Sequence, residues 1–313
     1  MIPSRRILLG TGSQVPALNL PFAYGTMPSG ITVTRASSAT YFDSTGTLQT
    51  ASNNVGRIDY DPTTLQCLGL LVEGASMNYL LNSGTPATQT TASLGVGTYT
   101  LWVVGSGDAT SSPNTASGSG FGVATAGAPN TFSVFGTGTV DITVSGSLTR
   151  FQLEPLAYPT SYIATTGTTA SRAADVVTYS YVFTSGGSIV YQATIFSTGL
   201  NFQHYSIDNG GASLQVSLSN LNGYIFNSSF QFQSNITFSQ GKSAFNFSPT
   251  QGAHAVNGLA SVKGTVASFP ATLNRLVLGA SSTLTGQMYG HIQSFAYYKP
   301  PGIPLSQLSQ ASR

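Results

Sequence analysis

Short runs of apolar or alternating residues, each closed by glycine, serine, asparagine or proline, follow one another along most of the chain. Residues 99–104 (YTLWVV), 131–135 (TFSVF) and 140–144 (VDITV) are the clearest examples. Their length, their alternation and their content of β-branched and aromatic residues are typical of β-strands. We find no long amphipathic helical pattern anywhere in the sequence. These features predict an all-β protein.

The composition limits the partners that such a chain can have. Only 6% of the residues are charged, against a usual ~25%, and 41% are hydrophobic, so the chain is not of the disordered class. The 11 basic residues form no stripe that would bind nucleic acid. No apolar run reaches the ~20 residues of a membrane span or the ~7–15 residues of a signal-peptide core. We therefore expect a protein that is made in the cytoplasm, with a polar but uncharged surface.

The sequence offers no pattern for a metal or a cofactor. Cys67 is the only cysteine, which excludes an intrachain disulfide. His204, His254 and His291 do not have the spacing of metal ligands, and no glycine-rich loop is followed by a helix. Asp208 precedes Asn-Gly, which predicts a tight turn rather than a calcium site. We predict neither metal nor cofactor.

Changes in composition and in hydrophobic pattern divide the chain into four parts. Residues 1–30 contain four prolines and no sustained period, which predicts an extended arm that docks on another protein. Arg5 and Arg6 are the candidate docking residues in this arm. The remaining parts are a β-hairpin module (31–84), a first β-sandwich with a connecting segment (85–175) and a second β-sandwich (176–313).

The end of the chain carries a pattern of its own. Residues 273–298 run from an aliphatic strand through a polar turn into G-x-M-x-G-x-I and an aromatic strand, and L-S-x-L follows. The alternation breaks near Gln293 and Ser294, which predicts a β-bulge or a strand covered on both faces. This pattern resembles the end of a concanavalin A-like (laminin G-like) jelly roll. The resemblance covers residues 176–313 and implies that a short final helix packs beside the Gly-x-Ile strand. The matching positions are Gly290, Ile292, Phe295, Tyr298, Leu305 and Leu308.

A second resemblance lies upstream. The segments RASSATYFDSTGTLQTA, RIDYDP, GLLVEGASMNYLLNS and QLEPLAYPTSYIATTGTTASRAADV are similar to a module of bacteriophage structural and tail-fibre proteins. This chain departs from the module at Gly74 and Ser76, where glutamate and arginine are expected. The resemblance implies a virion protein in which the QLEP segment passes from one sandwich to the next. The matching residues are Arg35, Ala36, Ser37, Ala39, Tyr41, Arg57, Asp59, Tyr60, Gly69, Leu70, Leu71, Glu73, Asn78, 80–83, Gln152, Leu153, Glu154, Pro159, Thr160, Ser161, Tyr162, Ile163, Arg172 and Asp175.

The acidic residues argue against a glycoside hydrolase, an activity that occurs among concanavalin A-like proteins. Such an enzyme needs two carboxyl groups that flank one bond. After Asp175 the sequence holds a single acid, Asp208. Asp108, Asp141 and Glu154 lie on separate segments of the first sandwich, so we expect no pair to converge within one chain. We predict that the protein is not an enzyme.

The acids of the hairpin module have a simpler interpretation. Asp59, Asp61 and Glu73 share this module with Arg35 and Arg57. We expect these acids to pair with the two arginines rather than to act as acid and base.

A binding surface remains as the functional hypothesis. Neutral sugars bind to aromatic faces together with amide and hydroxyl groups, and the chain is rich in all three. The candidate carbohydrate-binding residues are Tyr205, Asn209, Tyr224, Asn227, Tyr289 and His291.

Together these features predict an all-β fibre or spike of a bacteriophage, on the head or the tail of the particle. Its N-terminal arm would attach to other virion proteins, and its C-terminal jelly roll would contact a glycan of the host surface. We expect a homotrimer without nucleic acid or membrane insertion. Two alternatives stay open: a capsule or lipopolysaccharide depolymerase with an intersubunit active site, and a bacterial carbohydrate-binding adhesin.

Overall fold

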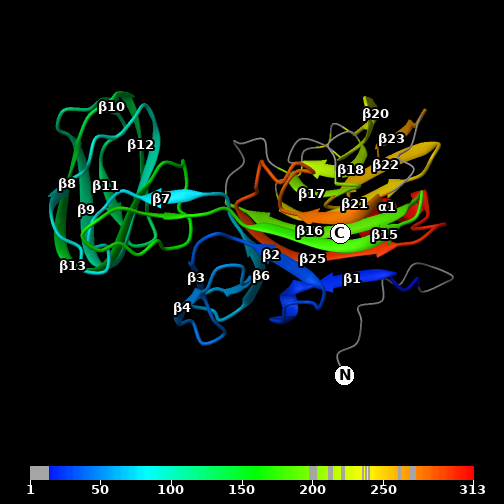
Figure 1. Ribbon diagram of the computed structural model, residues 1–313, viewed down its shortest axis with the longest axis horizontal. Helices are drawn as coiled ribbons and strands as arrows, with labels where there is room; N and C mark the ends of the chain where they lie inside the picture. The colour runs from blue at the N-terminus through cyan, green and yellow to red at the C-terminus, as the bar shows by residue number, and fades with distance from the viewer. Residues whose placement is uncertain are drawn as a thin grey trace.

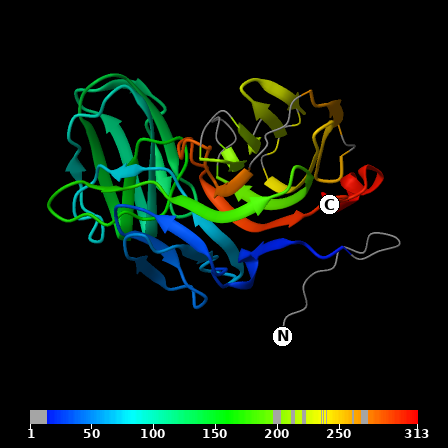
Figure 2. The same cartoon turned by 45° about the vertical axis from the view of Figure 1, so that its right-hand side comes forward.

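The computed structural model describes residues 14–196, 203–210, 214–219, 223–234, 236, 238, 240–259, 262–267 and 273–313. The chain is all-β, as predicted, and forms two sandwich-like bodies side by side, with N-terminal strands below them (Figures 1 and 2). The predicted arm residues Arg5 and Arg6 lie outside the described part. Among the residues described, no helix is long and apolar enough to cross a membrane.

The C-terminal sandwich consists of two antiparallel sheets that enclose one core. The larger sheet contains, in spatial order, β23 (Val262–Thr265), β22 (Gln251–Val256), β21 (Gln240–Phe247), β16 (Gly187–Ile195), β25 (Gly290–Tyr298), β6 (Cys67–Val72) and β5 (Arg57–Tyr60), and β1 (Leu18–Pro21) pairs with the other end of β25. The smaller sheet contains β2 (Ile31–Thr34), β15 (Val176–Phe183), β24 (Leu273–Leu278), β17 (Gln203–Asp208), β18 (Leu214–Ser219), β19 (Gly223–Asn227) and β20 (Phe230–Gln233). Tyr191, Phe245 and Phe295 of the larger sheet and Ile207 and Leu276 of the smaller are fully buried between the two.

The end of the chain follows the predicted pattern. On β16, Gln192 pairs with Ser294 and Ala193 pairs with Ile292, so Gln293 is an extra residue and the predicted bulge is confirmed. The 3-10 helix η2 (Leu305–Gln307) and the short helix α1 (Leu308–Ala311) cover the outer face of the larger sheet. Leu308 is fully buried there, beside Val190 and Tyr298.

The other body is one sheet that folds over onto itself, and we call it the folded sheet. Its strands are β8 (Gln89–Thr90), β9 (Gly97–Pro113), β10 (Ser117–Ser119), β11 (Val123–Thr125), β12 (Asn130–Gly136) and β13 (Val140–Glu154). β13 pairs along its whole length with residues 100–113 of β9, and the two strands bend together near Gly105, Gly107 and Gly146, whose φ angles are positive. Only glycine adopts such angles without strain. The bend lets the two halves of β9 enclose a core that contains Leu101 and Ala109.

Two small pairs complete the fold. The hairpin β3 (Ala39–Phe42) and β4 (Leu48–Ala51) projects from the N-terminal part, and β7 (Ser76–Asn78) pairs with β14 (Ala170–Arg172) between the two bodies (Figure 1). The 3-10 helix η1 (Phe22–Tyr24) follows β1 and buries Phe22 completely.

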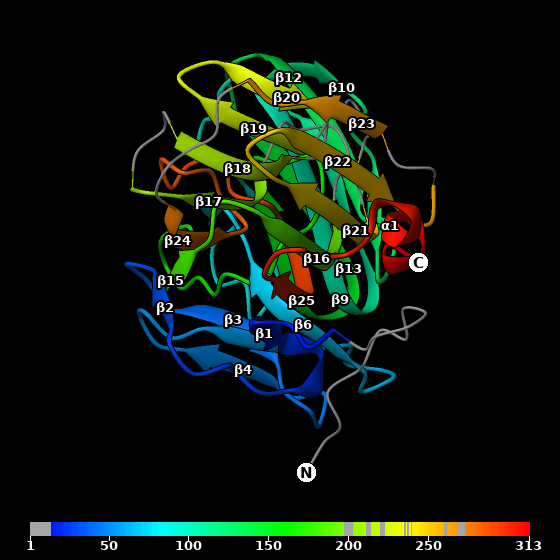
Figure 3. The same cartoon turned by 90° about the vertical axis from the view of Figure 1, so that its right-hand side faces the viewer.

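The N-terminal strands differ from the predicted division of the chain. β1 lies within the predicted arm, and β2, β5 and β6 lie within the predicted hairpin module, yet all four extend the sheets of the C-terminal sandwich (Figure 3). Leu18, Leu20, Leu70 and Val72 are buried in the same core as β16 and β25. The physical reason is that β25 and β15 each offer an edge whose backbone groups need partners, and the N-terminal strands supply them.

Candidate functional site

Five charged side chains meet in the interior, where the two bodies and the N-terminal strands come together. Arg35 and Arg57 both bind the carboxylate of Asp175, at 2.8 and 2.5 Å. Arg57 and Arg172 both bind the carboxylate of Glu73, at 2.8 and 3.0 Å. Each of the five is at most 2% exposed. We call these five residues the joint cluster.

Strand pairing brings the joint cluster together from distant parts of the sequence. The antiparallel register of β2 and β15 sets Arg35 opposite Asp175, one residue beyond the last pair. The register of β5 and β6 brings Arg57, the first residue of β5, beside the end of β6, which Glu73 follows. The backbone N–H of Asp175 also donates to the carbonyl of Glu73, at 2.8 Å.

Glu73 is ionised within the joint cluster. Burial by itself would raise the pKa of Glu73, but Arg172, Arg57 and two hydrogen bonds from Ser161 overcome this effect and lower the pKa to about 2. The hydroxyl of Ser161 also accepts hydrogen bonds from Arg57 and Arg172, at 3.0 and 2.8 Å. Ser161 lies in the connecting segment, which links β13 to β14, and it therefore binds this segment to the joint cluster.

The predicted pairing of Glu73 with Arg57 is confirmed, whereas the other two acids of the module have different partners. Asp59 accepts a hydrogen bond from His291 at 2.8 Å and another from the backbone N–H of Phe42. Asp61 accepts backbone N–H groups within its own turn. Neither acid forms an ion pair with Arg35 or Arg57 in the structure.

Glu154 lies buried next to the joint cluster and forms no ion pair with any residue that the structure describes. Five hydrogen bonds reach its two oxygens, from Trp102 Nε1, Gln152, Ser76, and both the backbone N–H and the hydroxyl of Thr160. Burial raises the pKa of Glu154, and these hydrogen bonds oppose that rise. Glu154 thus fixes both Trp102 on the folded sheet and Thr160 on the connecting segment.

The two departures from the phage module have a structural explanation. A side chain at Gly74 would collide with the hydroxyl group of Tyr289, which donates to the carbonyl of Ala75 at 3.3 Å. Ser76 fills the position where arginine is expected, and it donates to Glu154 at 2.9 Å. These contacts account for the small residues at both positions.

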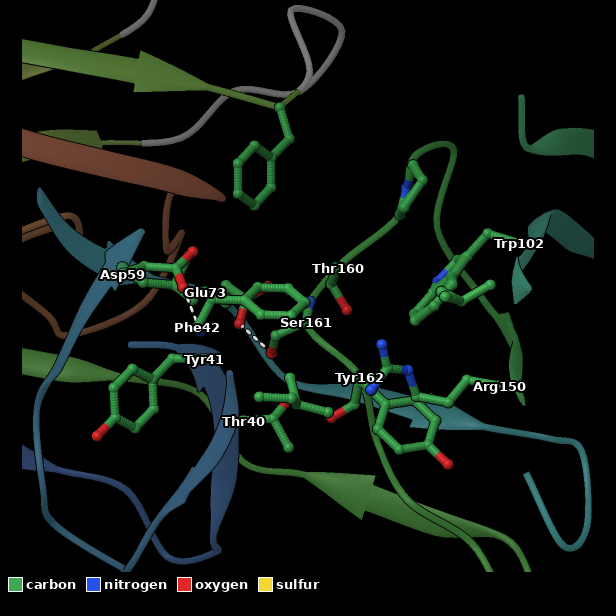
Figure 4. Close-up of a pocket in the computed structure, with 15 residues that line it drawn as sticks. Thr40, Tyr41, Phe42, Asp59, Glu73, Trp102, Arg150, Thr160, Ser161 and Tyr162 are labelled. Carbon is green, nitrogen blue, oxygen red and sulfur yellow. Dashed lines mark hydrogen bonds between the residues drawn. The ribbon is translucent and has the colours of Figure 1, made fainter. Parts of the chain in front are cut away.

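A cleft of about 280 Å³ opens above the joint cluster, between the hairpin β3–β4, the folded sheet and the start of the C-terminal sandwich. Figure 4 shows its side chains, with Asp59, Glu73 and Ser161 near Phe42 and with Trp102, Arg150 and Tyr162 together at the other end. We call this space the joint cleft. It is lined by Thr40, Tyr41, Phe42, Leu48, Asp59, Leu71, Glu73, Trp102, Val104, Arg150, Pro159, Thr160, Ser161, Tyr162 and Phe196.

Three half-buried side chains form the part of the joint cleft next to the folded sheet. The rings of Trp102 and Tyr162 meet edge to face with centroids 6.2 Å apart. The guanidinium of Arg150 lies 5.7 Å from the centroid of Tyr162, within range of a cation–π interaction (Figure 4). Trp102 is fixed by Glu154, and the hydroxyl of Tyr162 is fixed by Ser83 at 2.7 Å. These bonds hold the aromatic faces in place without a ligand.

The structure disperses the six predicted carbohydrate-binding residues. Tyr205 is fully buried in the core, where it packs against Tyr191 and Phe295, so its assignment to a binding surface is corrected. Tyr224 is only 8% exposed, and its hydroxyl donates to Gln203 at 3.3 Å. Tyr205 faces the core between the two sheets. Alternation places Tyr224 on the opposite face of the smaller sheet, where it packs edge to face against Phe230 with centroids 5.4 Å apart.

The other predicted residues also lie apart from one another. Asn209 is exposed in the turn after β17, and Asn227 is half-buried at the end of β19. Tyr289 packs edge to face against Tyr158 with centroids 5.2 Å apart. His291 binds Asp59 and thereby joins β25 to β5. The six residues therefore do not form one site, and none of them lines the joint cleft.

The sequence contains one signal for the joint cleft, which is the position of Trp102 in the alternation of its strand. Alternation along β9 puts Leu101 and Val103 in the core, whereas Trp102 and Val104 face the joint cleft. A strict period of two along this strand places Trp102 on the face opposite Leu101 and Val103. Arg150 carried no comparable signal, because only the pairing of β13 with β9 brings it close to Trp102.

The carboxylates come closer together than the sequence predicted. Neighbouring residues of the connecting segment bind two different acids, since Ser161 binds Glu73 and Thr160 binds Glu154. Both acids are fully buried, and every carboxylate oxygen has a donor. Asp208 is buried as well and pairs with Arg275 at 2.7 Å. In the described part of the chain, no three His, Cys, Asp or Glu residues are grouped so as to hold a metal ion.

Comparisons with known proteins add little to this geometry. No protein-family model matches the chain, and no curated protein matches it. Among solved structures, the chain is similar to domain 4 of AbnA, a GH43 extracellular arabinanase from Geobacillus stearothermophilus, in complex with arabinotriose. The TM-score is 0.37 and the identity 12%, over 50% of this chain and 81% of that chain. A similarity this low says nothing about a ligand, so the side chains of the joint cleft alone indicate what it could bind.

Proposed function

We propose that the protein is a non-catalytic structural component of a bacteriophage virion, a fibre or spike, which contacts glycans through the joint cleft. The observation that carries the glycan-binding role is the preformed aromatic surface of Trp102 and Tyr162 in a cleft that also presents Tyr41, Phe42 and Phe196. Aromatic faces bury the apolar side of a sugar ring, and pockets with a few fixed polar groups orient it.

The structural role rests on the residues of the phage resemblance. All five members of the joint cluster match that module, and so do Glu154, Thr160 and Ser161 beside them. These residues hold the folded sheet against the C-terminal sandwich. A rigid connection between domains suits a fibre that must present a distant binding site in a fixed orientation.

Attachment to the particle is proposed through residues 1–30, with Arg5 and Arg6 as docking residues. Because β1 belongs to the sandwich, deletion of residues 1–13 is the appropriate test, and deletion through residue 30 would remove a strand. The shortened protein should stay folded and be absent from purified particles. Its normal incorporation would contradict the proposed attachment, and antibody labelling of intact particles would show whether the protein lies on the head or the tail.

We also propose a homotrimer, because phage fibres that resemble this chain are usually threefold and the surface has little charge to keep copies apart. Light scattering of the purified protein at micromolar concentration should give the mass of three chains. A stable monomer would contradict this.

Glycan binding can be measured with the single tryptophan of the chain, since Trp102 lines the joint cleft. Host capsule and lipopolysaccharide fragments should shift or quench its fluorescence in a saturable way. Tyr162→Ala removes one aromatic face and should weaken binding about tenfold or more, while Tyr24→Ala, at an exposed tyrosine remote from the cleft, should not. A full set of host glycans that leaves the fluorescence unchanged would refute the binding role.

One observation favours a hydrolase as the second candidate function. Burial raises the pKa of Glu154, whereas the arginines lower that of Glu73 to about 2, and a glycosidase likewise uses one protonated and one ionised carboxyl. We favour binding because both carboxylates are buried and occupied by protein donors. Purified protein should release no reducing sugar from host glycans. Release that disappears in Glu154→Gln, in a variant that remains folded by circular dichroism, would promote the depolymerase.

A further inference from the structure

The polar side chains of the joint cleft are mostly occupied by one another. Thr40 donates to the carbonyl of Tyr162, Thr160 to Glu154, and Ser161 to Glu73. Such groups have no free donor to offer to a ligand. Specific recognition in the cleft must therefore come from lining side chains whose polar atoms have no protein partner.

Arg150 is such a side chain. Its guanidinium forms no hydrogen bond or ion pair with any residue that the structure describes, and it lies over the ring of Tyr162. The planar guanidinium carries five N–H donors in a rigid fork that matches a carboxylate. Because the ring of Tyr162 holds it, the fork is preorganised and loses little side-chain entropy when it binds.

The charges around the joint cleft leave Arg150 uncompensated. The lining residues contain two carboxylates, Glu73 and Asp59. Glu73 is neutralised by Arg57 and Arg172, and Asp59 is bonded to His291 and to a backbone N–H. The positive charge of Arg150 thus faces the cleft without an anionic partner from the described protein.

We propose that the joint cleft selects acidic sugars, and that a carboxylate of the sugar binds Arg150 in a bidentate manner while the ring packs against Trp102 and Tyr162. This inference rests on the proposed function and specifies its ligand class. The volume of about 280 Å³ lies just below the roughly 300–1,000 Å³ of sites that enclose a drug-sized molecule, so the cleft suits a short stretch of saccharide. A uronic acid, which carries its carboxylate at the edge of the ring, has the required shape.

The test compares sugars that differ only in charge. The probes are trimers of galacturonate and galactose and trimers of glucuronate and glucose, titrated against the full chain with Trp102 fluorescence as the readout. At least one uronate trimer should bind about tenfold or more tightly than its neutral counterpart, since charge-assisted bidentate hydrogen bonds are the strong ones. This preference should shrink as salt is raised from 20 mM to roughly 0.5 M, because ions screen exposed charges.

Three variants test whether Arg150 causes the preference for the uronate. Arg150→Gln should abolish the preference for the uronate, so that the acidic and neutral trimers bind with the same affinity. Arg150→Lys keeps the charge but loses the fork and should retain only part of the preference. Arg313→Gln removes one exposed positive charge at the end of the chain and serves as the matched control, with the preference intact.

The outcomes separate this inference from the proposed function. Equal binding of the acidic and neutral trimers, or an acidic preference that survives in Arg150→Gln, would overturn the inference while glycan binding stands. If none of the four trimers binds saturably, the inference is overturned. The wider set of host glycans would then decide whether the cleft binds glycans at all. A uronate preference lost only in Arg150→Gln and reduced in Arg150→Lys supports the inference.

Discussion

Asp175 shows how one residue can organise the fold of a charge-poor protein. One carboxylate oxygen accepts from Arg35, which directly follows β2, and the other accepts from Arg57 of β5 and from the backbone N–H of Glu73 at 3.0 Å. A buried carboxylate is costly unless it is paired and fully hydrogen-bonded. Because all these donors must be in place together, Asp175 enforces one arrangement of β2, β5, β6 and β15.

Replacing Asp175 with asparagine should therefore destabilise the protein strongly. The change removes the negative charge shared by Arg35 and Arg57 and leaves positive charge buried without compensation. Loss of one partner of a buried ion pair typically costs about 3–5 kcal/mol, and chemical denaturation should show a loss of this size. Asp108→Asn, at a half-buried acid away from the joint cluster, is the control and should change stability by less than about 0.5 kcal/mol. A similar small change in Asp175→Asn would contradict the importance of the cluster.

Glu73 makes stability dependent on pH in a predictable direction. Its pKa is about 2 in the folded protein, against 4.5 for an ordinary exposed glutamate, so the folded state holds fewer protons than the unfolded state between these values. A lowered pKa stabilises above pH 4.5, and the stabilisation disappears as the pH falls toward 2. The shift corresponds to about 3 kcal/mol.

Urea denaturation from pH 6 to pH 2.5 should therefore show stability falling with pH. In Glu73→Gln the decrease should be smaller, although the variant will be less stable at every pH because Arg57 and Arg172 lose their partner. Glu154 acts in the opposite sense, since a raised pKa favours the folded state at low pH. An unchanged slope in Glu73→Gln would mean that other carboxyls control acid unfolding.

At the scale of elements, local patterns predicted strands but not their distant partners. The broken alternation in residues 287–298 indicated either a bulge near Gln293 or a strand covered on both faces, and the structure has the bulge. Leu305 and Leu308 indicated the final helical turn. The pairing of β1 and β6 with β25 joins residues more than 200 positions apart. Nothing in a short window encodes such a pairing, because it depends on which sheet edge remains open after the other strands have paired.

The candidate site was harder to predict for the same reason. An aromatic residue such as Tyr205 suits a sugar-binding surface, but the opposing sheet decides which face of its strand is buried in the core. The joint cleft combines residues from β3, β9, β13 and the connecting segment. Its aromatic residues were visible in the sequence, whereas their convergence depends on the bend in β9 and on the joint cluster.

The strand β1 offers a test of the revised boundary of the sandwich. Phe22, directly after β1, is fully buried in the core of the C-terminal sandwich, so Phe22→Ala should cost about 3–5 kcal/mol. Tyr24→Ala, two residues further on and 46% exposed, should cost less than about 1 kcal/mol. Thermal denaturation of both variants would show the difference. Equal stability of the two variants would mean that this segment does not belong to the core and is an independent arm.

At the scale of the whole molecule, the joint cluster and Glu154 should make the two bodies unfold as one. The contacts run from Glu73 through Ser161 and Thr160 to Glu154, and so from the C-terminal sandwich to the folded sheet. Two bodies connected only by a flexible linker would unfold independently, each at its own temperature.

The single tryptophan makes this coupling measurable. Trp102 reports on the folded sheet, while far-ultraviolet circular dichroism reports on all strands. In the wild type the two melting curves should coincide, as expected for one cooperative transition.

Arg172→Met removes the guanidinium that binds Glu73, Thr160, Ser161 and the carbonyl of Gly74, and should separate the curves by several degrees. Arg313→Met, at the exposed chain end, should leave them coincident. If the wild-type curves already differ, or if those of Arg172→Met still coincide at a lower melting temperature, then the joint cluster stabilises its surroundings without coupling the two bodies.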